Sequence, residues 1–198
     1  MSLLYNNKSK LVDKVFNKVY DKYDLMNDIM SLGTHRMWKK NLVSWINPKK
    51  NNKIIDVASG TGDIAKLCSE NTNNSCEIVC VEPNEKMLQQ GKNKLRNFNN
   101  IRWKMSSAEY LPFEDGTFDY YAISFGIRNV SNFNKSLNEA YRVLKNGGRF
   151  FCLEFSKVEN EIINLLYKNY SKLIPSLGKI VVGDDRPYRY LTESIRKF

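Results

Sequence analysis

The sequence lacks the residues and apolar runs that mark several classes of protein. It contains one histidine, His35, and four cysteines that form no C-x-x-C pair, so a mechanism with two imidazoles is excluded and there is no sign of a zinc site or a disulfide framework. No run approaches the roughly 18–20 apolar residues of a membrane span, and the first ten residues lack the apolar core of a secretory signal. We expect one soluble intracellular domain without a metal. The cysteines expected to be reduced and buried are Cys68, Cys76, Cys80 and Cys152.

Positive charge is concentrated at the beginning of the chain. The formal net charge is +10, and up to Lys53 eleven basic residues stand against four acidic ones. A basic N-terminal part suits nucleic acid, an anionic membrane surface or an acidic ligand. Asn and Lys are abundant throughout, however, and compositional drift explains the same excess, so charge alone leaves the partner open.

Strands and helices alternate from Lys53 onward, whereas the preceding residues have helical apolar spacing. Strands are predicted at 53–58, 76–82, 101–105, 117–125 and 149–155, with helices at 63–70, 84–97 and 133–145. This alternation predicts a mostly parallel sheet with helices on both faces, in which ligands lie beyond the carboxyl ends of the strands.

The chain is predicted to become helical again after the fifth strand. A helix is expected from 159 to 173, ending before Pro175 and Gly178, with a last segment around 190–198. Because no sixth strand follows, we expect the strand at 149–155 to form an apolar, unpaired edge.

The stretch DVASGTGDIA, residues 56–65, follows the first predicted strand. Gly60 and Gly62 let the backbone approach a ligand closely, and Gly60-x-Gly62-x-x-Ala65 satisfies the loose dinucleotide fingerprint. Glu82 stands twenty residues after Gly62, at the end of the second strand, where a carboxylate can accept both hydroxyls of a ribose. NAD and S-adenosylmethionine fit these residues equally well.

The loops after the third and fourth strands favour the smaller cofactor. Ser107, Ala108 and the apolar corner at 111–113 suit a single adenine, whereas a dinucleotide needs room for a second nucleotide. The segment SFGIRN, residues 124–129, stands where methyltransferases acting on base or amide nitrogens have an Asn/Asp-Pro-Pro-aromatic motif. The layout resembles class I S-adenosylmethionine-dependent methyltransferases, and the missing motif counts against a nucleic-acid substrate.

Five longer stretches make the resemblance more specific. They are YDLMNDIMSLGTHRMWK (23–39), DVASGTGDIA (56–65), ISFGIRNV (123–130), YRVLKNGGRFFCLEFS (141–156) and YRYLTESIRKF (188–198). From about Leu11 to its last residue, the chain resembles the ubiquinone/menaquinone biosynthesis C-methyltransferase family. Members methylate a ring carbon of a polyprenylated benzoquinol or naphthoquinol with S-adenosylmethionine.

The resemblance implies a fold and a division of the chain. We expect an α/β, Rossmann-like class I methyltransferase sheet, with residues 1–52 as a helical lid, 53–156 as the cofactor-binding core and 157–198 as a helical substrate cover. The strands that complete the sheet in the family are expected to be missing here. Five interpretations stay open: a truncated chain, an inactive one, a homodimer across the edge strand, a member of a quinone-synthesis complex and a non-catalytic scaffold.

The resemblance also implies a set of cofactor contacts. The family commonly has Gly in place of Ser59, Asp in place of Glu82 and Asn in place of Ser107. The residues expected to bind the cofactor are Asp56, Gly60, Thr61, Gly62, Glu82, Ser107, Ala108 and Ser124.

Arg128 is the residue we expect to promote the reaction. The phenol of a quinol has a pKa near ~10, and a fixed guanidinium beside its oxygen would lower that pKa and stabilise the phenolate. Pairing of Arg128 with a helix carboxylate is the alternative. Arg itself is an unlikely base, so water held by Tyr23, Asp24 or His35 is expected to take the proton, although His35 also suits a packing role.

The polyprenyl tail needs an apolar route and a lipid surface. Lysines beside the apolar helices would let the same face sit on anionic lipid, in the bacterial cytoplasm or on the matrix face of the mitochondrial inner membrane. An RNA or small-molecule methyltransferase and a NAD-dependent oxidoreductase stay as alternatives. Stripes of this kind belong to a core more often than to a tunnel. The candidate route residues are Met26, Ile29, Met30, Met37, Trp38, Ile162, Ile163, Leu165, Leu166 and Tyr167.

Overall fold

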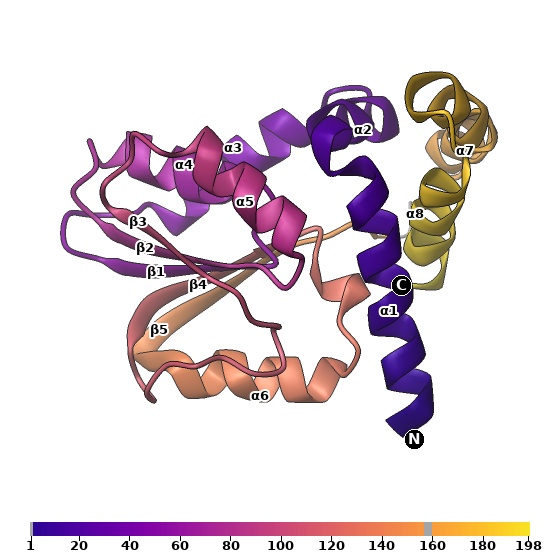
Figure 1. Ribbon diagram of the computed structural model, residues 1–198. Helices are drawn as coiled ribbons and strands as arrows, with labels where there is room; N and C mark the ends of the chain where they lie inside the picture. The colour runs from indigo at the N-terminus through magenta and orange to yellow at the C-terminus, as the bar shows by residue number, and fades with distance from the viewer. Residues whose placement is uncertain (1, 157–159) are drawn as a thin grey trace.

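Five parallel strands form the centre of the computed structural model. It describes residues 2–156 and 160–198, except for the side chains at 2–7, 9, 162–164, 166, 168, 177, 178, 180–182 and 197. The sheet order is β3-β2-β1-β4-β5 (Figure 1), so the order reverses at β1, where open α/β sheets bind ligands. The strands are β1 (Lys53–Val57), β2 (Glu77–Val81), β3 (Ile101–Lys104), β4 (Phe118–Ser124) and β5 (Leu144–Leu153).

Helices cover both faces of the sheet and one of its ends. The helices α3 (His35–Ile46), α4 (Asp63–Asn71) and α5 (Glu85–Lys94) lie over one face, and α6 (Phe133–Val143) lies over the other (Figure 1). This arrangement confirms the predicted fold class. No helix in the described part of the chain is long and apolar enough to cross a membrane.

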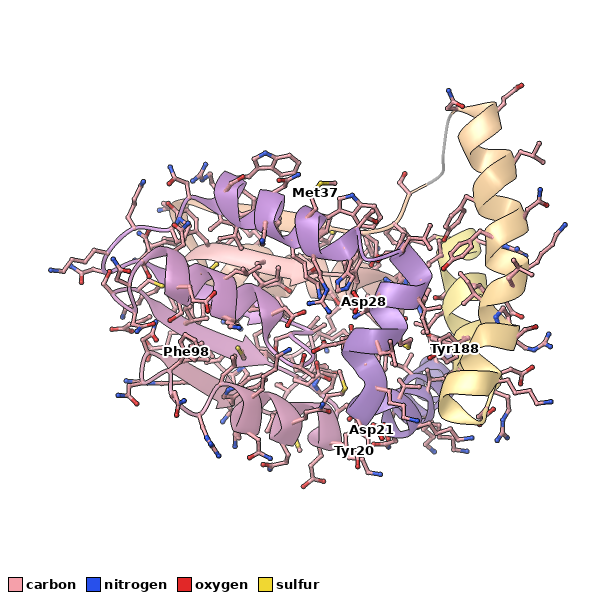
Figure 2. All side chains as sticks on the ribbon, turned by 90° about the horizontal axis from the view of Figure 1, so that it is seen from above. Tyr20, Asp21, Asp28, Met37, Phe98 and Tyr188 are labelled. Carbon is pink, nitrogen blue, oxygen red and sulfur yellow. The ribbon has the colours of Figure 1, made fainter. Side chains whose placement is uncertain are left out.

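A separate layer of helices stands at the carboxyl ends of the strands. It consists of α1 (Ser2–Val19), the 3-10 turn η1 (Tyr20–Lys22), α2 (Tyr23–Ser31), α7 (Glu161–Val182) and α8 (Arg186–Lys197). Figure 2 shows α7 and α8 beside the sheet, with Tyr188 on the side of α8 that faces the rest of the layer. We call these five elements the helical layer.

Three apolar clusters form the core of the described residues: two within the sheet and its covering helices, and one within the helical layer. Two lie on the opposite faces of the sheet, and both faces are buried as parallel strands require. One joins the strands to α3 and α4, and the other joins them to α6. The third belongs to the helical layer alone and consists of Val19, Met26, Met30, Ile174, Tyr188 and Leu191, with aromatic residues packed around it. The helical layer therefore has its own core.

The predicted helix boundary at Pro175 is wrong, because α7 continues through this residue to Val182. Proline removes one backbone hydrogen bond and usually bends or breaks a helix. Ile174, its neighbour, is fully buried in the third cluster. Packing of this helix against α2 and α8 therefore outweighs the local preference for a break.

Two other predicted boundaries shift by a few residues. The helix expected to end at Lys145 ends at Val143, because Leu144 already pairs with Phe118 as the first residue of β5. The helix expected at 84–97 spans Glu85–Lys94, and Asn84 caps its start, since its side chain accepts the N–H of Met87 at 3.0 Å. An asparagine in this position satisfies a backbone donor that the helix leaves free.

The strand β5 lies at one edge of the sheet. Within the described residues it pairs only with β4, which confirms the predicted unpaired edge, and Phe150 on it is exposed. Cys68, Cys76 and Cys80 are buried, whereas Cys152 on β5 is exposed. The expectation of four buried cysteines is therefore wrong for Cys152, because an edge strand leaves one flank uncovered.

Gly91 allows α5 to pack closely against Trp103 of β3. A Cβ at this position would lie 2.1 Å from the indole of Trp103. Alanine is favoured over glycine in a helix by about 1 kcal/mol, yet we expect Gly91→Ala to lower the free energy of unfolding by ~1–3 kcal/mol through overpacking. Urea unfolding measures the change. In a Trp103→Leu background the same substitution should cost much less, and an equal cost in both backgrounds would contradict this explanation.

Candidate cofactor and active site

The neighbouring strands β1 and β4 both end in a strained turn. Ala58 follows β1 with a φ of +52°, and Phe125 follows β4 with a φ of +56°. A non-glycine residue in this region costs of order 1 kcal/mol or more, and such residues cluster at functional sites. Ser59, where the family commonly has glycine, has no positive φ. Its side chain therefore causes no strain of this kind in the loop.

The two glycines of the loop serve different contacts. Both have positive φ, +58° for Gly60 and +84° for Gly62. A Cβ on Gly60 would touch the ring of Tyr23 at 3.4 Å, whereas a Cβ on Gly62 would lie 2.7 Å from the side chain of Leu95. At Gly60 the positive φ is thus the reason for glycine, since the contact with Tyr23 would be an ordinary one, whereas at Gly62 a side chain would also clash with the protein core.

Glu82 stands directly after β2 and binds the glycine loop. Its Oε2 accepts the N–H of Gly60 at 2.9 Å, and its Oε1 accepts the N–H of Asn84 at 3.0 Å. Burial raises the pKa of Glu82 to about 7, although these two hydrogen bonds oppose the shift. Each carboxylate oxygen has a further lone pair, so Glu82 keeps acceptors for the hydroxyls of a ligand.

A small cavity lies between the ends of β1 and β4. Asp56 and Ser124 line it from the sheet and Thr61 from the glycine loop, while Tyr23 and Lys39 line it from α2 and α3. The Oγ of Ser124 is buried and has no hydrogen-bond partner among the described residues. Both carboxylate oxygens of Asp56 are buried as well and make no hydrogen bond of good geometry there, although the main-chain N–H of Ala65 favours the charged form. Buried polar atoms almost always have a partner. These atoms are therefore available to polar groups of a ligand, and the cavity itself, of about 10 Å³, has room for about one water molecule.

A chain of charged side chains ties the helical layer and α3 to the loop. Lys94 Nζ lies 2.9 Å from Asp24 Oδ2 and 2.8 Å from Asp63 Oδ1, and Lys39 Nζ lies 2.7 Å from Asp63 Oδ2. Although burial acts in the opposite direction, the charges of Lys39 and Lys94 lower the pKa of Asp63. The hydroxyl of Thr61 accepts from Lys94 at 3.2 Å.

Asp24 was predicted to be a site residue. Its ion pair with Lys94 places it beside the glycine loop, where the Oγ1 of Thr61 lies 3.4 Å from Asp24 Oδ1. Sequence reasoning missed Lys39, Asp63 and Lys94. Asp63 stands immediately after Gly62, which was a usable signal. Lys94 gave none, because its partners are 31 and 70 residues away along the chain.

His35 lies at the start of α3 and does not line the cavity in the described part of the chain. Its Nε2 is 2.9 Å from Asp28 Oδ1, and Arg36 binds both oxygens of the same carboxylate. Burial lowers the pKa of His35, while the hydrogen bond to Asp28 opposes this shift. These contacts favour the packing role over a role as base.

Ser107 and Ala108 follow β3, at the same end of the sheet. Ala108 is buried against the cluster that includes Val81 and Leu111, and the carbonyl of Ser107 accepts the N–H of Tyr110 at 3.1 Å. Neither belongs to the described lining of the cavity between β1 and β4. All the predicted cofactor residues thus lie at the carboxyl ends of strands, although the cavity gathers only some of them.

Arg128 lies on η2 (Ile127–Asn129), directly after β4, and is almost fully buried. Its Nη1 donates to the carbonyl of Phe125 at 2.8 Å and to Glu154 Oε1 at 2.5 Å. The alternative prediction of a carboxylate partner therefore describes this contact, but Glu154 follows β5 and is on no helix. Burial raises the pKa of Tyr23 to about 12, and the charge of Arg128 partly offsets this rise. The guanidinium thus lies within electrostatic range of the cavity.

The candidate route for the substrate tail is partly wrong. Met26 and Met30 belong to the core of the helical layer, so they are packing residues. Trp38 instead packs on the rings of Phe125 and Phe155, with ring centroids 6.3 and 5.9 Å away. Met37 and Leu165 are exposed, and Tyr167 is half-buried. The side chains of Ile162, Ile163 and Leu166 lie outside the described residues.

Comparisons with known sequences agree with the predicted family. Residues 4–198 match the model of the ubiE/COQ5 methyltransferase family. The ubiquinone/menaquinone biosynthesis C-methyltransferase UbiE of Rickettsia prowazekii (strain Madrid E) is 50% identical over 201 residues, covering 98% of this chain and 81% of the relative. The protein of the same name from Rickettsia massiliae (strain Mtu5) is 51% identical with the same coverage.

Comparisons with solved structures support the fold. A SAM-dependent methyltransferase from Aquifex aeolicus matches with a TM-score of 0.57 at 18% identity, over 67% of this chain and 78% of that chain. The YcgJ protein from Bacillus subtilis matches with a TM-score of 0.57 at 21% identity, over 72% of this chain and 58% of that chain. The sheet and its covering helices are therefore those of a known methyltransferase fold.

The buried carboxyl of Asp56 gives a test of the site by pH. Burial raises its pKa to about 7, whereas an unfolded Asp titrates near ~3.9. Its contribution to stability is therefore complete below about pH 4 and is lost as the pH rises to 7, by at most roughly 4 kcal/mol. We expect the stability of Asp56→Asn relative to wild type to rise over this range and to stay constant above it.

Urea unfolding at several pH values measures this difference. Asp119→Asn is the matched control, because Asp119 also lies in the sheet but binds Lys145 and the N–H of Lys53, which lower its pKa although burial opposes them. Its difference from wild type should change only in more acidic solution and with the opposite sign. A difference for Asp56→Asn that does not vary with pH would show that the carboxyl is not perturbed.

Proposed function

The chain belongs to the ubiE/COQ5 methyltransferase family, and we propose that it methylates a ring carbon of a polyprenylated benzoquinol or naphthoquinol. As a member of this family it is a methyltransferase, and S-adenosylmethionine supplies the electrophilic methyl group when bound. The observation that supports the substrate most strongly is the 50–51% identity to UbiE proteins over 98% of the chain. Family membership also favours this function over that of a NAD-dependent oxidoreductase or an RNA methyltransferase.

The residues at the strand ends divide the binding of the cofactor among them. We assign the carboxylate of Glu82 to the ribose hydroxyls, because it lies beside the loop and keeps free lone pairs. Asp56 and Ser124, whose buried polar atoms line the cavity, are assigned to the polar end of the cofactor. Ser107 and Ala108 are assigned to the edge of the adenine.

Arg128 is assigned to the oxygen of the quinol ring. A neutral quinol carbon is a weak nucleophile, and the phenolate is a much stronger one. The guanidinium is already fixed by Phe125 and Glu154, so it needs no rearrangement to stabilise the negative charge. The ring of Phe155 lies beside it, with the guanidinium carbon 5.5 Å from the ring centre, and the ring of Phe125 packs against that of Phe155. They offer an aromatic surface for the quinol.

The proton of the quinol leaves through water on the side of α2. Tyr23 has a pKa raised to about 12 by burial, so it is neutral near pH 7 and serves as a hydrogen-bond partner for that water. Asp24 lies next to the loop in its ion pair with Lys94. His35 is bound to Asp28 away from the cavity lining. We therefore assign the water to Tyr23 and Asp24, and the lid role to residues 1–52.

Incubation with labelled S-adenosylmethionine and the demethylated benzoquinol and naphthoquinol tests the function. We expect label to appear on a ring carbon of at least one quinol. Arg128→Ala should lower kcat about 100-fold or more, while folding and cofactor binding persist. Arg149→Ala is the matched control, because Arg149 lies on β5 against the rings of Tyr120 and Phe151. Wild-type protein that methylates neither quinol would contradict the function, and an unimpaired Arg128→Ala would contradict the role of Arg128.

We also propose that the helical layer and α3 dock on an anionic membrane surface facing the cytoplasm. Large apolar side chains on and between α2 and α3 are exposed, with 73% of Leu32, 55% of Met37 and 67% of Trp45 accessible to solvent. Met37 lies on the outer side of α3 (Figure 2). The basic N-terminal part of the chain adds an electrostatic attraction to anionic lipid.

Co-sedimentation with vesicles that contain anionic lipid tests the docking. Binding should weaken as salt rises from about 0.05 M to about 0.5 M, because added ions screen the attraction. Replacing Leu32 and Met37 together by Ser should weaken binding further. Tyr141→Ser, at an exposed residue of α6 on the far side of the sheet, should have no effect. Binding that does not depend on salt would contradict the proposal.

A further inference from the structure

Glu154 stands directly after β5 and binds Arg128 at two points. Its Oε1 accepts from Arg128 Nη1 at 2.5 Å, and its Oε2 accepts from the main-chain N–H of Arg128 at 3.3 Å. The N–H of Phe155 also donates to Oε1, at 3.0 Å. The side chains of Glu154 and Arg128 are each only 5% exposed. The hydrogen bonds that this carboxylate accepts among the described residues thus come from Arg128 and from the N–H of Phe155.

The same contacts hold the strained end of β4. Arg128 Nη1 donates to the carbonyl of Phe125 at 2.8 Å, and Phe125 is the residue with a φ of +56°. Lys8 from α1 donates to the carbonyls of Arg128 and Val130 at 3.0 and 2.8 Å. Residues that hold an unusual backbone conformation at a site determine the geometry of that site. Glu154 thus supplies the negative charge that fixes Arg128 in this turn.

The pattern of hydrogen bonds leaves one nitrogen of the guanidinium available. Nε donates to the Oγ of Ser194 at 3.4 Å, and Nη1 donates to Glu154 and Phe125. The described residues offer no hydrogen-bond partner to Nη2. A guanidinium with one side bound and one donor free is suited to hold an oxyanion in a fixed position.

We propose that Glu154 is the positioning residue for methyl transfer. By binding both the main chain and the side chain of Arg128, it fixes the guanidinium so that Nη2 is the donor for the oxygen of the quinol. It also balances part of the charge of Arg128 and so determines how strongly that charge favours the phenolate. This inference rests on the proposed function, in which Arg128 faces the quinol oxygen.

Three tyrosines and a lysine are further ionisable groups around Arg128. Burial raises the pKa of Tyr23 on α2, Tyr167 on α7 and Tyr190 on α8, and the charge of Arg128 opposes each rise. Lys8 on α1 contacts the carbonyl oxygens of the turn. Among these groups Glu154 is the one with an ion pair to Arg128, so its replacement is expected to change the pH profile most.

Two variants separate positioning from charge. Glu154→Asp keeps the charge but withdraws the carboxylate by one methylene, and we expect kcat to fall about 100-fold with an unchanged pH profile. Glu154→Gln removes the charge, and we expect a similar loss of kcat together with a shift of the acidic limb of kcat to lower pH, because the uncompensated guanidinium lowers the pKa of the bound phenol. The dissociation constant of S-adenosylmethionine, measured by equilibrium dialysis, should change less than about threefold in both.

Asp119→Asn is the control, because Asp119 likewise binds a cation and a backbone N–H, those of Lys145 and Lys53, but at the opposite end of β4. It should keep the wild-type kcat. A folded Glu154→Asp with wild-type kcat would overturn the inference, and this variant decides the matter if Glu154→Gln fails to fold. Unshifted limbs in a folded Glu154→Gln would overturn the electrostatic part. Inactive wild-type protein would instead contradict the proposed function, and the inference with it.

Discussion

The site depends on the way in which β1 and β4 end side by side. These strands are hydrogen-bonded neighbours, with Val57 opposite Ile123, and each continues into a residue with positive φ. The turns touch, since a Cβ on Gly126 would lie 2.5 Å from the Cβ of Ala58. The glycine loop and the turn that carries Arg128 are therefore fixed relative to each other by the backbone. Any ligand between them meets both the cofactor loop and the guanidinium.

The helical layer joins this end of the sheet largely through polar contacts. Its apolar core is separate from the two clusters of the sheet, and its links include Asp24 to Lys94, Lys8 to the turn after β4, and Asn84 to Asp13 and Asn17 of α1. Polar contacts at a surface contribute less to stability than a shared apolar core. The layer therefore has an apolar core that does not depend on its contacts with the loop, which supports the proposed lid role.

The sequence was informative where function depends on residues that are close together along the chain. The sheet, the glycine loop and Glu82 follow from local patterns, but the hydrogen bond from the N–H of Gly60 to Glu82 was not among the expectations. The pair of Arg128 and Glu154 spans 26 residues, and that of Asp24 and Lys94 spans 70, so no local pattern specifies either. Tertiary packing likewise decided the course of α7 through Pro175 and the exposure of Cys152. The family resemblance suggested that Ser59, in place of a glycine, would restrict the loop. The residue with the unfavourable positive φ is instead Ala58.

A crystal structure with S-adenosylhomocysteine tests the central claim most directly, which is that the ends of β1, β2 and β4 form one site for cofactor and substrate. The account predicts ribose hydroxyls bound to Glu82, the polar end of the ligand beside Asp56 and Ser124, and the sulfur on the side of Arg128. A ligand bound elsewhere, or one whose sulfur is separated from Arg128 by the protein core, would contradict it.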